Sequence, residues 1–530
     1  MRQLGSVSLC LLVLFLAGCP KQVPFLASPD DLPGTASKDS TAAPTPTAPA
    51  PSPAFLPPPF TLPLNSLAMT VKPVSMPFAG ESSIPIEARE AILALSRTEE
   101  VPTGFGFAFD GATPATTGMP TLQSLSQAPG PACGTFDQLL EPKGAVPKEP
   151  AIRALRAAVE PPVVGARRDF YVRSISVRAV CVAVGAHGAI WLDERDQWRF
   201  AAPDLISLSE KFDGHFPQIT EAYGAGPSGR ADGYNWGDDR LNFLISQQVP
   251  QEYGGFVEPL DFFPDSFTEK TYGKRSNFGK VLYLNAIYGL THLLNTMIHE
   301  YVHIVFYGHR LEVYSQNHGL SLPLGQDSSY FGWADASERW LNEGMAVLSE
   351  YRFGQSPALT YRAYLERYLV NPNTYDLADF LRLTEKDTAN YGGALLFSAY
   401  AQARHPAFAK EVQLARGVST GAVDEVMRSS LRRTFPEVYR DYALSLLLDG
   451  YHADVPGQYR IPYVDVFGDF GGTRMEGVTS STVPPRLNGV RYVHVRFESG
   501  KGMLRLRNAG TMQGTLLLLA PASAPGFTGD

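Results

Sequence analysis

The sequence predicts an α+β protein, in which extended segments come before and after a long helical region. In the amino-terminal part, apolar and β-branched residues form strand-like runs at 170–172 and 179–184. Beyond Glu343, apolar residues recur at helical spacing in four segments, 358–369, 391–404, 422–433 and 436–448. Near the carboxyl end, alternating or apolar runs lie between turn residues at 492–497, 503–506 and 514–519. These last runs predict a small β-sandwich, and short helices are expected earlier at 86–95 and 151–159.

Residues 1–19 have the pattern of a targeting segment. Met1 and Arg2 give a positive start, residues 7–17 are apolar, and Leu16-Ala17-Gly18-Cys19 places small residues directly before a cysteine. This pattern resembles a bacterial lipoprotein signal. The resemblance implies removal of residues 1–18, acylation of Cys19, and a lipid-anchored, extracytoplasmic location in a bacterial cell envelope, at the outer membrane or cell surface. An ordinary cleaved signal peptide and an uncleaved anchor are the alternatives, although the apolar stretch is too short to span a bilayer.

Residues 19–80 are expected to form a linker. The part from Pro20 to Pro63 is rich in Pro, Ala, Ser and Thr, so it cannot bury enough apolar surface to fold by itself. Such chains favour polyproline II, which gives a reach on the order of 100 Å at about 3 Å per residue. The sequence therefore predicts a stalk between the lipid and the folded part.

The chain has four cysteines. Cys10 leaves with the leader and Cys19 is expected to carry lipid, so Cys133 and Cys181 remain in the folded part. An oxidising compartment favours a disulfide between them, with two free thiols as the alternative. Neither belongs to a C-x-x-C unit, so we do not expect these two cysteines to bind zinc.

The remainder of the chain is long enough for two or three domains. With 530 residues, 44% of them hydrophobic, it can bury a large core, and we divide it into a β-rich region 81–192, a central domain 193–455 and a β domain 456–530. The net charge of −8 gives no basic footprint for nucleic acid. No later segment is apolar enough to cross a membrane, no repeat is visible, and the sequence gives no oligomeric state.

The most informative motif is His299-Glu300-Tyr301-Val302-His303. Its flanks, 293–298 and 304–306, are apolar without proline, and Gly308 offers a stop, which predicts a buried helix. Residues four apart share one helix face, so both imidazoles can reach one metal ion with Glu300 beside it. The alternative is a pair of core histidines and a buried acid with protein partners. Burying three polar groups is costly, and a divalent cation compensates for that cost.

A catalytic zinc site needs a third protein ligand and one open position. Glu343 is one candidate, on a helix predicted over 337–351 with Asp335 or Ser337 as its N-cap. His309 is the other, at the spacing that metzincins use. That pattern needs Gly three residues after the second His so that the chain can turn, and Phe306 stands there instead. The sequence favours Glu343, and His309 is then a surface residue or one that supports a ligand.

The pair HEYVH and Trp340-Leu341-Asn342-Glu343-Gly344-Met345-Ala346 resembles the gluzincin metallopeptidases, most closely the hyicolysin-type family. The resemblance implies a zincin (thermolysin-like) two-lobed domain, one zinc ion held by His299, His303 and Glu343, and Glu300 as general base. Weaker similarity extends from about residue 170 to about 448. The gap before Glu343 is longer than in most gluzincins, and we interpret residues 308–335 as an inserted loop near the cleft.

The resemblance also implies peptide-bond hydrolysis. Zinc would acidify a water molecule and polarise the scissile carbonyl while Glu300 moves the proton. Tyr391 is the candidate oxyanion donor by its order in the chain, with simple packing as the alternative. Glu350 either hydrogen-bonds a ligand histidine or is a solvated acid, and Arg339 is expected to be a surface or ion-pairing residue.

Two functions follow from these expectations. The first is a zinc endopeptidase acting on extracytoplasmic proteins or peptides, because the chain lacks the Gly-x-Met-Glu-Asn type of motif of related aminopeptidases. The run 280–286 alternates like an edge strand that could bind an extended substrate. The second is a surface-anchored binding lipoprotein that keeps a zincin scaffold without turnover.

Overall fold

The computed structural model describes residues 60–521, except 65–66, 75, 77–78, 100–102, 116–160, 174, 228–238, 252, 319–328, 355–357, 371, 379–388 and 451–453. The predicted leader, the lipid-bearing Cys19, most of the predicted stalk, the predicted helix 151–159 and Cys133 lie outside the described residues. Within the described part, no helix combines the length and the apolar character needed to cross a bilayer.

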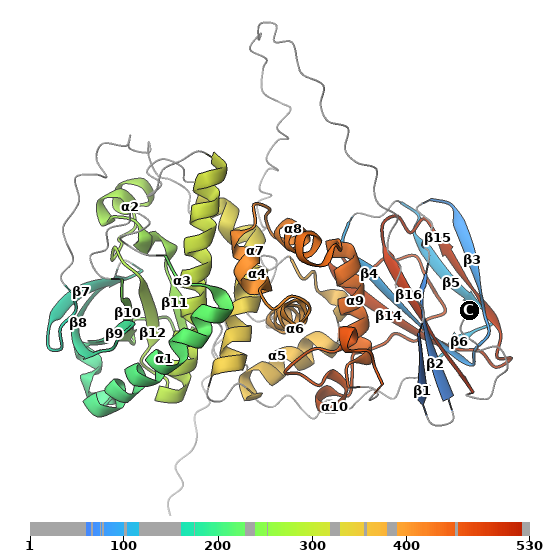
Figure 1. Ribbon diagram of the computed structural model, residues 1–530, viewed down its shortest axis with the longest axis horizontal. Coiled ribbons are helices and arrows are strands. Elements are labelled where there is room, and N and C mark those ends of the chain that lie inside the picture. The colour runs from blue at the N-terminus through green and yellow to red at the C-terminus, as the bar shows by residue number, and fades with distance from the viewer. Residues whose placement is uncertain are drawn as a thin grey trace, which may run out of the picture. The chain divides into compact units, whose positions relative to one another are not determined.

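A six-stranded mixed sheet supports the helix that carries the His299 motif (Figure 1). Its spatial order is β11 (Gly255–Val257), β12 (Val281–Asn285), β10 (Leu241–Ser246), β9 (Gly188–Asp193), β8 (Ile175–Val184) and β7 (Arg167–Val172). Strand β10 pairs in parallel with β9 and β12, and the other pairs are antiparallel. Helix α1 (Ala202–Tyr223) packs on β8 and β9, and α3 (Leu290–His318) packs on α1, β11 and β12.

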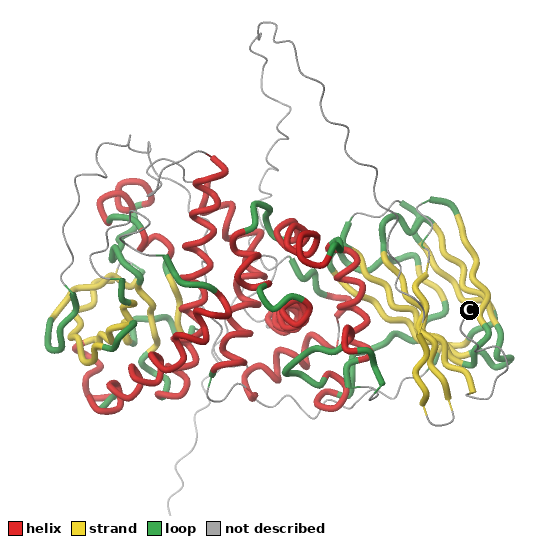
Figure 2. The backbone as a smooth tube through the Cα atoms, in the orientation of Figure 1, coloured by secondary structure: helices red, strands yellow, loops and turns green. Residues whose placement is uncertain are grey.

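The helices after α3 form a second layer (Figure 2). Helix α4 (Ser329–Phe353) packs along α3, and α6 (Ala389–Arg404) packs on α4 and on α5 (Ala358–Val370). The remaining helices are α7 (Phe408–Leu414), α8 (Thr420–Leu431) and α9 (Phe435–Leu448). The four predicted helices after Glu343 are thus confirmed, each within a few residues. Short helices complete the described chain: η3 (Glu194–Arg199), η4 (Pro259–Phe262), α2 (Asp265–Tyr272), η5 (Pro372–Thr374), η6 (Gly457–Tyr459) and α10 (Val466–Phe470).

A β-sandwich combines strands from both ends of the described chain. One sheet has the order β1 (Phe60–Leu64), β2 (Leu67–Val74), β16 (Gln513–Pro521), β4 (Glu90–Arg97), β14 (Gly489–Arg496) and β6 (Thr113–Pro114). The other has the order β13 (Ser480–Ser481), β5 (Gly106–Asp110), β15 (Gly502–Arg507) and β3 (Glu81–Ile86). The two sheets share one apolar core that includes Leu93, Phe107, Val493, Leu504 and Leu516. Figure 1 shows this mixture as blue and red strands side by side.

This arrangement corrects the predicted domain division. The β-rich region 81–192 is not one unit, because β3 to β6 complete the sandwich while β7 to β9 belong to the mixed sheet. The predicted carboxy-terminal β domain is likewise incomplete by itself, since β16 lies between β2 and β4. Strands β1 and β2 also fall within the predicted stalk, which is therefore shorter than residues 19–80. Alternation along one strand does not reveal which distant strand will pair with it.

Three local predictions also need correction. The segment 86–95 is not a helix: it contains the end of β3, a short connection and most of β4, in which residues 91–96 are buried between neighbouring strands and the sandwich core. Gly308 does not end α3, which continues to His318; instead, a Cβ there would lie 2.4 Å from Pro227, so glycine allows close packing. Helix α4 begins at Ser329, which places Asp335 and Ser337 inside it, so the described residues of the predicted loop 308–335 belong to α3 and α4.

Candidate metal centre

Two histidines of α3 face α4 from one side of the helix. His299 and His303 are one turn apart, and their rings lie 4.9 Å apart between centroids. His299 is 5% exposed and His303 is fully buried, because Ile298, Val302 and Ile304 hold the surrounding helix in the core. The predicted helix and its shared histidine face are confirmed.

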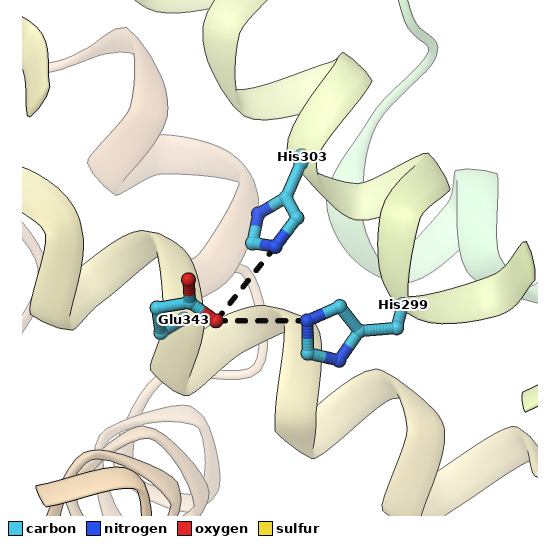
Figure 3. A group of neighbouring side chains, drawn as sticks. All are labelled: His299, His303 and Glu343. Atoms are coloured by element: carbon cyan, nitrogen blue, oxygen red, sulfur yellow. Dashed lines mark ion pairs between the residues drawn. The ribbon is translucent and has the colours of Figure 1, made fainter. Parts of the chain in front are cut away.

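Glu343 of α4 points at both imidazoles from the opposite side (Figure 3). Its Oε2 atom lies 3.6 Å from His299 Nε2 and 3.7 Å from His303 Nε2. These separations are too long for hydrogen bonds. Zinc bonds of about 2.0–2.2 Å in tetrahedral geometry place neighbouring ligand atoms about 3.4 Å apart. Among the described residues, these three form the group whose ligand atoms lie within 4.8 Å of one another, so the donor set and its spacing fit a zinc ion.

Each histidine is fixed through its other ring nitrogen. His303 Nδ1 lies 2.7 Å from Asn342 Oδ1, and His299 Nδ1 lies 3.3 Å from Glu350 Oε2. Both partners are oxygen acceptors, so each Nδ1 carries a hydrogen and each Nε2 faces Glu343, where an unprotonated Nε2 can offer its lone pair to a metal ion. Of the two sequence interpretations of Glu350, the structure supports contact with a ligand histidine. Sequence reasoning missed the role of Asn342, whose only signal is its place beside Glu343.

The pKa shifts of the three candidate ligands agree with a site that binds a cation. Burial lowers the pKa of His303 to about 4, so its ring is neutral near pH 7. Burial opposes ionisation of Glu343, but the two histidines and Arg339 outweigh it and lower its pKa to about 2. For His299, burial is outweighed by the Glu343 and Glu350 carboxylates, which raise its pKa to about 10. Without metal the site therefore holds a proton on His299, and a cation binding there would displace it.

Glu300 lies beside the site without belonging to the ligand group. It is fully buried on α3. A Cβ added to Gly255 would lie 3.4 Å from Glu300 Oε1 and 2.5 Å from Thr296 Cγ2, so the carboxylate reaches the start of β11. The absence of a side chain at Gly255 thus brings the sheet edge against α3 next to Glu300.

The structure changes which strand borders the site. The predicted strand 280–286 exists as β12, but it is buried at every position and pairs on both sides, with β10 and β11. Within the described residues, β7 and β11 are the two outermost strands of the sheet, and β11, which runs antiparallel to β12, is the one that packs against α3. The prediction that residues 280–286 form an edge strand, made from their alternating pattern, is therefore wrong.

The glycine after Glu343 explains how α4 is held. A Cβ at Gly344 would lie 2.6 Å from Ser398 Oγ and 2.7 Å from the Ala394 carbonyl oxygen of α6. Glycine therefore allows α6 to touch the backbone of α4 directly beside the third candidate ligand. This close contact fixes the axis of α4, and with it the direction in which Glu343 extends.

Arg339 lies beside Glu343, whereas His309 lies away from the candidate site. Arg339 has a side chain only 15% exposed, and its Nε lies 4.0 Å from Glu343 Oε1, so the ion-pairing interpretation holds. His309 lies on the uninterrupted helix α3, about 9 Å along the axis from His303, and cannot turn back to the site. Its ring instead approaches Gly224, where an added Cβ would lie 3.1 Å from Nε2.

Tyr391 and Cys181 have weaker support for their predicted roles. The ring of Tyr391 packs 5.6 Å from that of Tyr364, in agreement with the packing alternative, and its role as oxyanion donor stays a prediction. Cys181 is a buried free thiol on β8, and burial raises its pKa to about 11. The structure therefore gives no support to the predicted disulfide, whose other half, Cys133, lies outside the described residues.

Comparison with known proteins adds no family assignment. No family model matches the chain, and no curated protein is significantly similar to it.

Proposed function

We propose that this chain is a zinc endopeptidase that cleaves extracytoplasmic proteins or peptides. The observation that carries the proposal is the convergence of His299 Nε2, His303 Nε2 and Glu343 Oε2 in one buried place. Core histidines alone would not need both Nε2 atoms and a carboxylate oxygen directed at a common point. The fixed Nδ1 atoms make this arrangement suitable for a metal ion before the ion arrives.

When bound, a zinc ion supplies a Lewis acid that polarises a carbonyl oxygen and lowers the pKa of water. The chain contributes the proton carrier. Glu300 is outside the ligand group yet beside it, and its carboxylate would accept a proton from the attacking water and return it to the leaving amine. Burial of Glu300 keeps bulk water from competing for that proton.

Strand β11 is our candidate for the substrate platform. It is the outermost described strand on the side of α3, and a Cβ on its first residue, Gly255, would lie 3.4 Å from Glu300 Oε1. An extended peptide that pairs with β11 would pass the site along its length, with chain on both sides of the scissile bond. This geometry favours cutting within chains.

The amino terminus suggests where the enzyme acts. A lipid on Cys19 and a Pro-rich stalk would hold the catalytic part near a membrane while allowing it to reach substrates at a distance. We therefore propose a lipid-anchored enzyme of the bacterial cell envelope. Mass spectrometry of membrane-extracted protein tests this directly, because an unmodified amino terminus would exclude the anchor.

The function is tested by measuring bound zinc and cleavage of a mixed peptide library by the wild type and three variants. Glu300→Gln should keep one zinc per chain and lose about 10²-fold or more in turnover. Glu343→Ala should lose zinc, whereas the control His309→Ala should keep it. Zinc-loaded wild type that cleaves nothing would favour the binding-scaffold alternative, and a Glu300→Gln variant with full activity would overturn the mechanism.

A further inference from the structure

A second buried polar cluster lies where α6 meets α9. Its members are Tyr400 and Arg404 on α6, Arg433 just before α9, and Arg440 and Asp441 on α9. Tyr400, Arg440 and Asp441 are each at most 2% exposed. Ionisable groups at such depth are rare unless each has a partner.

The cluster has more positive than negative charge. Asp441 Oδ1 accepts hydrogen bonds from Arg440 Nε and Nη2, both at 3.0 Å, and Asp441 Oδ2 accepts one from Arg433 Nη2 at 2.8 Å. One carboxylate therefore serves two guanidinium groups. Arg404 adds a third, since its guanidinium carbon lies 5.2 Å from the Tyr400 ring centroid and its Nη2 donates to the Arg460 carbonyl. An uncompensated buried charge is strongly destabilising.

Four donors of this cluster have no hydrogen-bond partner within the described structure. They are Arg440 Nη1, Arg433 Nε, Arg404 Nε and Tyr400 Oη, all buried from solvent. Burial raises the pKa of Tyr400 above its ordinary range, so its hydroxyl keeps the hydrogen and can donate. Buried donors in native proteins nearly always have a partner, and an orphan group indicates a water molecule or an ion.

The same side chains are electrostatic neighbours. Tyr400 interacts with Asp441, Arg404 and Arg433, and Tyr459 of η6 interacts with Asp441, Arg440 and Arg433. The side chains that carry the orphan donors are thus neighbours on α6, on α9 and just before α9. Because three of the four belong to guanidinium groups, which only donate, the region suits an acceptor with negative charge and excludes a cation.

We propose that this cluster binds a small monovalent anion of the chloride class. One negative charge offsets one of the two excess positive charges that Arg404, Arg433 and Arg440 leave over Asp441, and a monatomic acceptor can take hydrogen bonds from several directions at once. The bound anion would join α6 to α9. Since α6 also touches α4 at Gly344, the site would stabilise the layer that carries Glu343. This inference does not depend on the proposed enzymatic activity.

Crystals grown in sodium bromide test the site directly, because bromide replaces chloride and scatters anomalously. We expect an anomalous peak within hydrogen-bonding distance of Arg440 Nη1 and Tyr400 Oη. Density at that position without anomalous signal, or with the geometry of a water molecule, would show that water satisfies the donors and would overturn the proposal.

Thermal unfolding gives an independent measure. The melting temperature of the wild type should be about 2 °C or more higher in sodium chloride than in sodium gluconate of equal ionic strength, because a ligand that binds only the folded state stabilises it.

Tyr400→Phe keeps the ring and removes one donor, so it should weaken chloride binding about five-fold. Arg440→Gln should abolish the response if it folds. Arg428→Gln, which alters an exposed ion pair with Asp424, is the control and should respond like the wild type. Equal melting temperatures in the two salts, or an unchanged response of Tyr400→Phe, contradict the proposal.

Discussion

Asn342 Oδ1 accepts a hydrogen bond from His303 Nδ1 over 2.7 Å, although Asn342 stands next to Glu343 in the chain. Adjacent residues of α4 therefore contact the same imidazole from two sides. Asn342 orients the ring, and Glu343 lies 3.7 Å from its other nitrogen. The Asn-Glu-Gly sequence thus combines a ring support, a candidate ligand and the glycine that admits α6.

Replacing Asn342 should loosen the metal site without removing a ligand. Asn342→Leu keeps a similar volume but leaves His303 Nδ1 without its acceptor, so the ring loses its fixed tautomer and direction. We expect zinc affinity to fall about 10- to 100-fold, as measured by competition with a chelator of known affinity. The control Asn317→Leu lies exposed on α3 and should not change affinity. Unchanged affinity in Asn342→Leu would show that His303 needs no such support.

Glu350 should have a charge effect as well as a hydrogen-bond effect on His299. Glu350→Leu removes the acceptor at 3.3 Å from His299 Nδ1, and we expect about a ten-fold or larger loss of zinc affinity. Glu350→Gln keeps an acceptor oxygen and removes only the charge, so its loss should be smaller. The same chelator competition measures both. Equal losses in the two variants would mean that the charge alone matters.

Gly255 should be required for the position of Glu300. An alanine Cβ would lie 2.5 Å from Thr296 Cγ2 and 2.7 Å from the Tyr283 carbonyl oxygen, so β11 or α3 must shift. We expect Gly255→Ala to destabilise the fold by about 1–3 kcal/mol and to lower turnover while zinc stays bound. Gly289→Ala is a matched control, because nothing lies within 4 Å of its Cβ. Full turnover in Gly255→Ala would show that the activity does not depend on the close packing of β11 beside Glu300.

Asp261 should make stability depend on pH away from the metal site. Burial raises its pKa from 3.8 to about 7, against the opposing hydrogen bonds from the Asn277 backbone amide and the Tyr283 hydroxyl. The folded chain therefore binds this proton more tightly than the unfolded chain does. Its contribution to stability is fully present below about pH 4 and is lost as pH rises to about 7, by roughly 1.4 kcal/mol per pH unit at most.

Asp261→Asn mimics the neutral carboxyl and removes this titration. Chemical denaturation at several pH values should show a free energy of unfolding that falls less between pH 4 and pH 7 than in the wild type. Asp169→Asn, at a carboxylate with a half-exposed side chain, is the control. Parallel curves for wild type and Asp261→Asn would contradict the prediction.

The candidate site shows where sequence reasoning succeeds. The spacing of His299, Glu300 and His303 fixes their relative placement as soon as the segment is helical, because 3.6 residues per turn is a local property. The sequence also favoured Glu343 over His309, since position 306 is Phe rather than the glycine that would let the chain turn back. The sequence could not predict that Asn342 and Glu350 contact the Nδ1 atoms of the two histidines, because these contacts depend on how α3 and α4 pack.

The sequence by itself determined the helix that carries His299 and His303, the four helices after Glu343, several strands and the residues most suited to hold a metal ion, because these follow from periodicity and side-chain chemistry over short distances. Only the tertiary structure decided that strands from the two ends of the chain share one sandwich, that β11 rather than β12 is outermost, and that Gly255, Gly308 and Gly344 are sites of close approach. Those outcomes depend on which surfaces meet across hundreds of residues. The local sequence around a strand or a glycine does not show which distant residues will contact it.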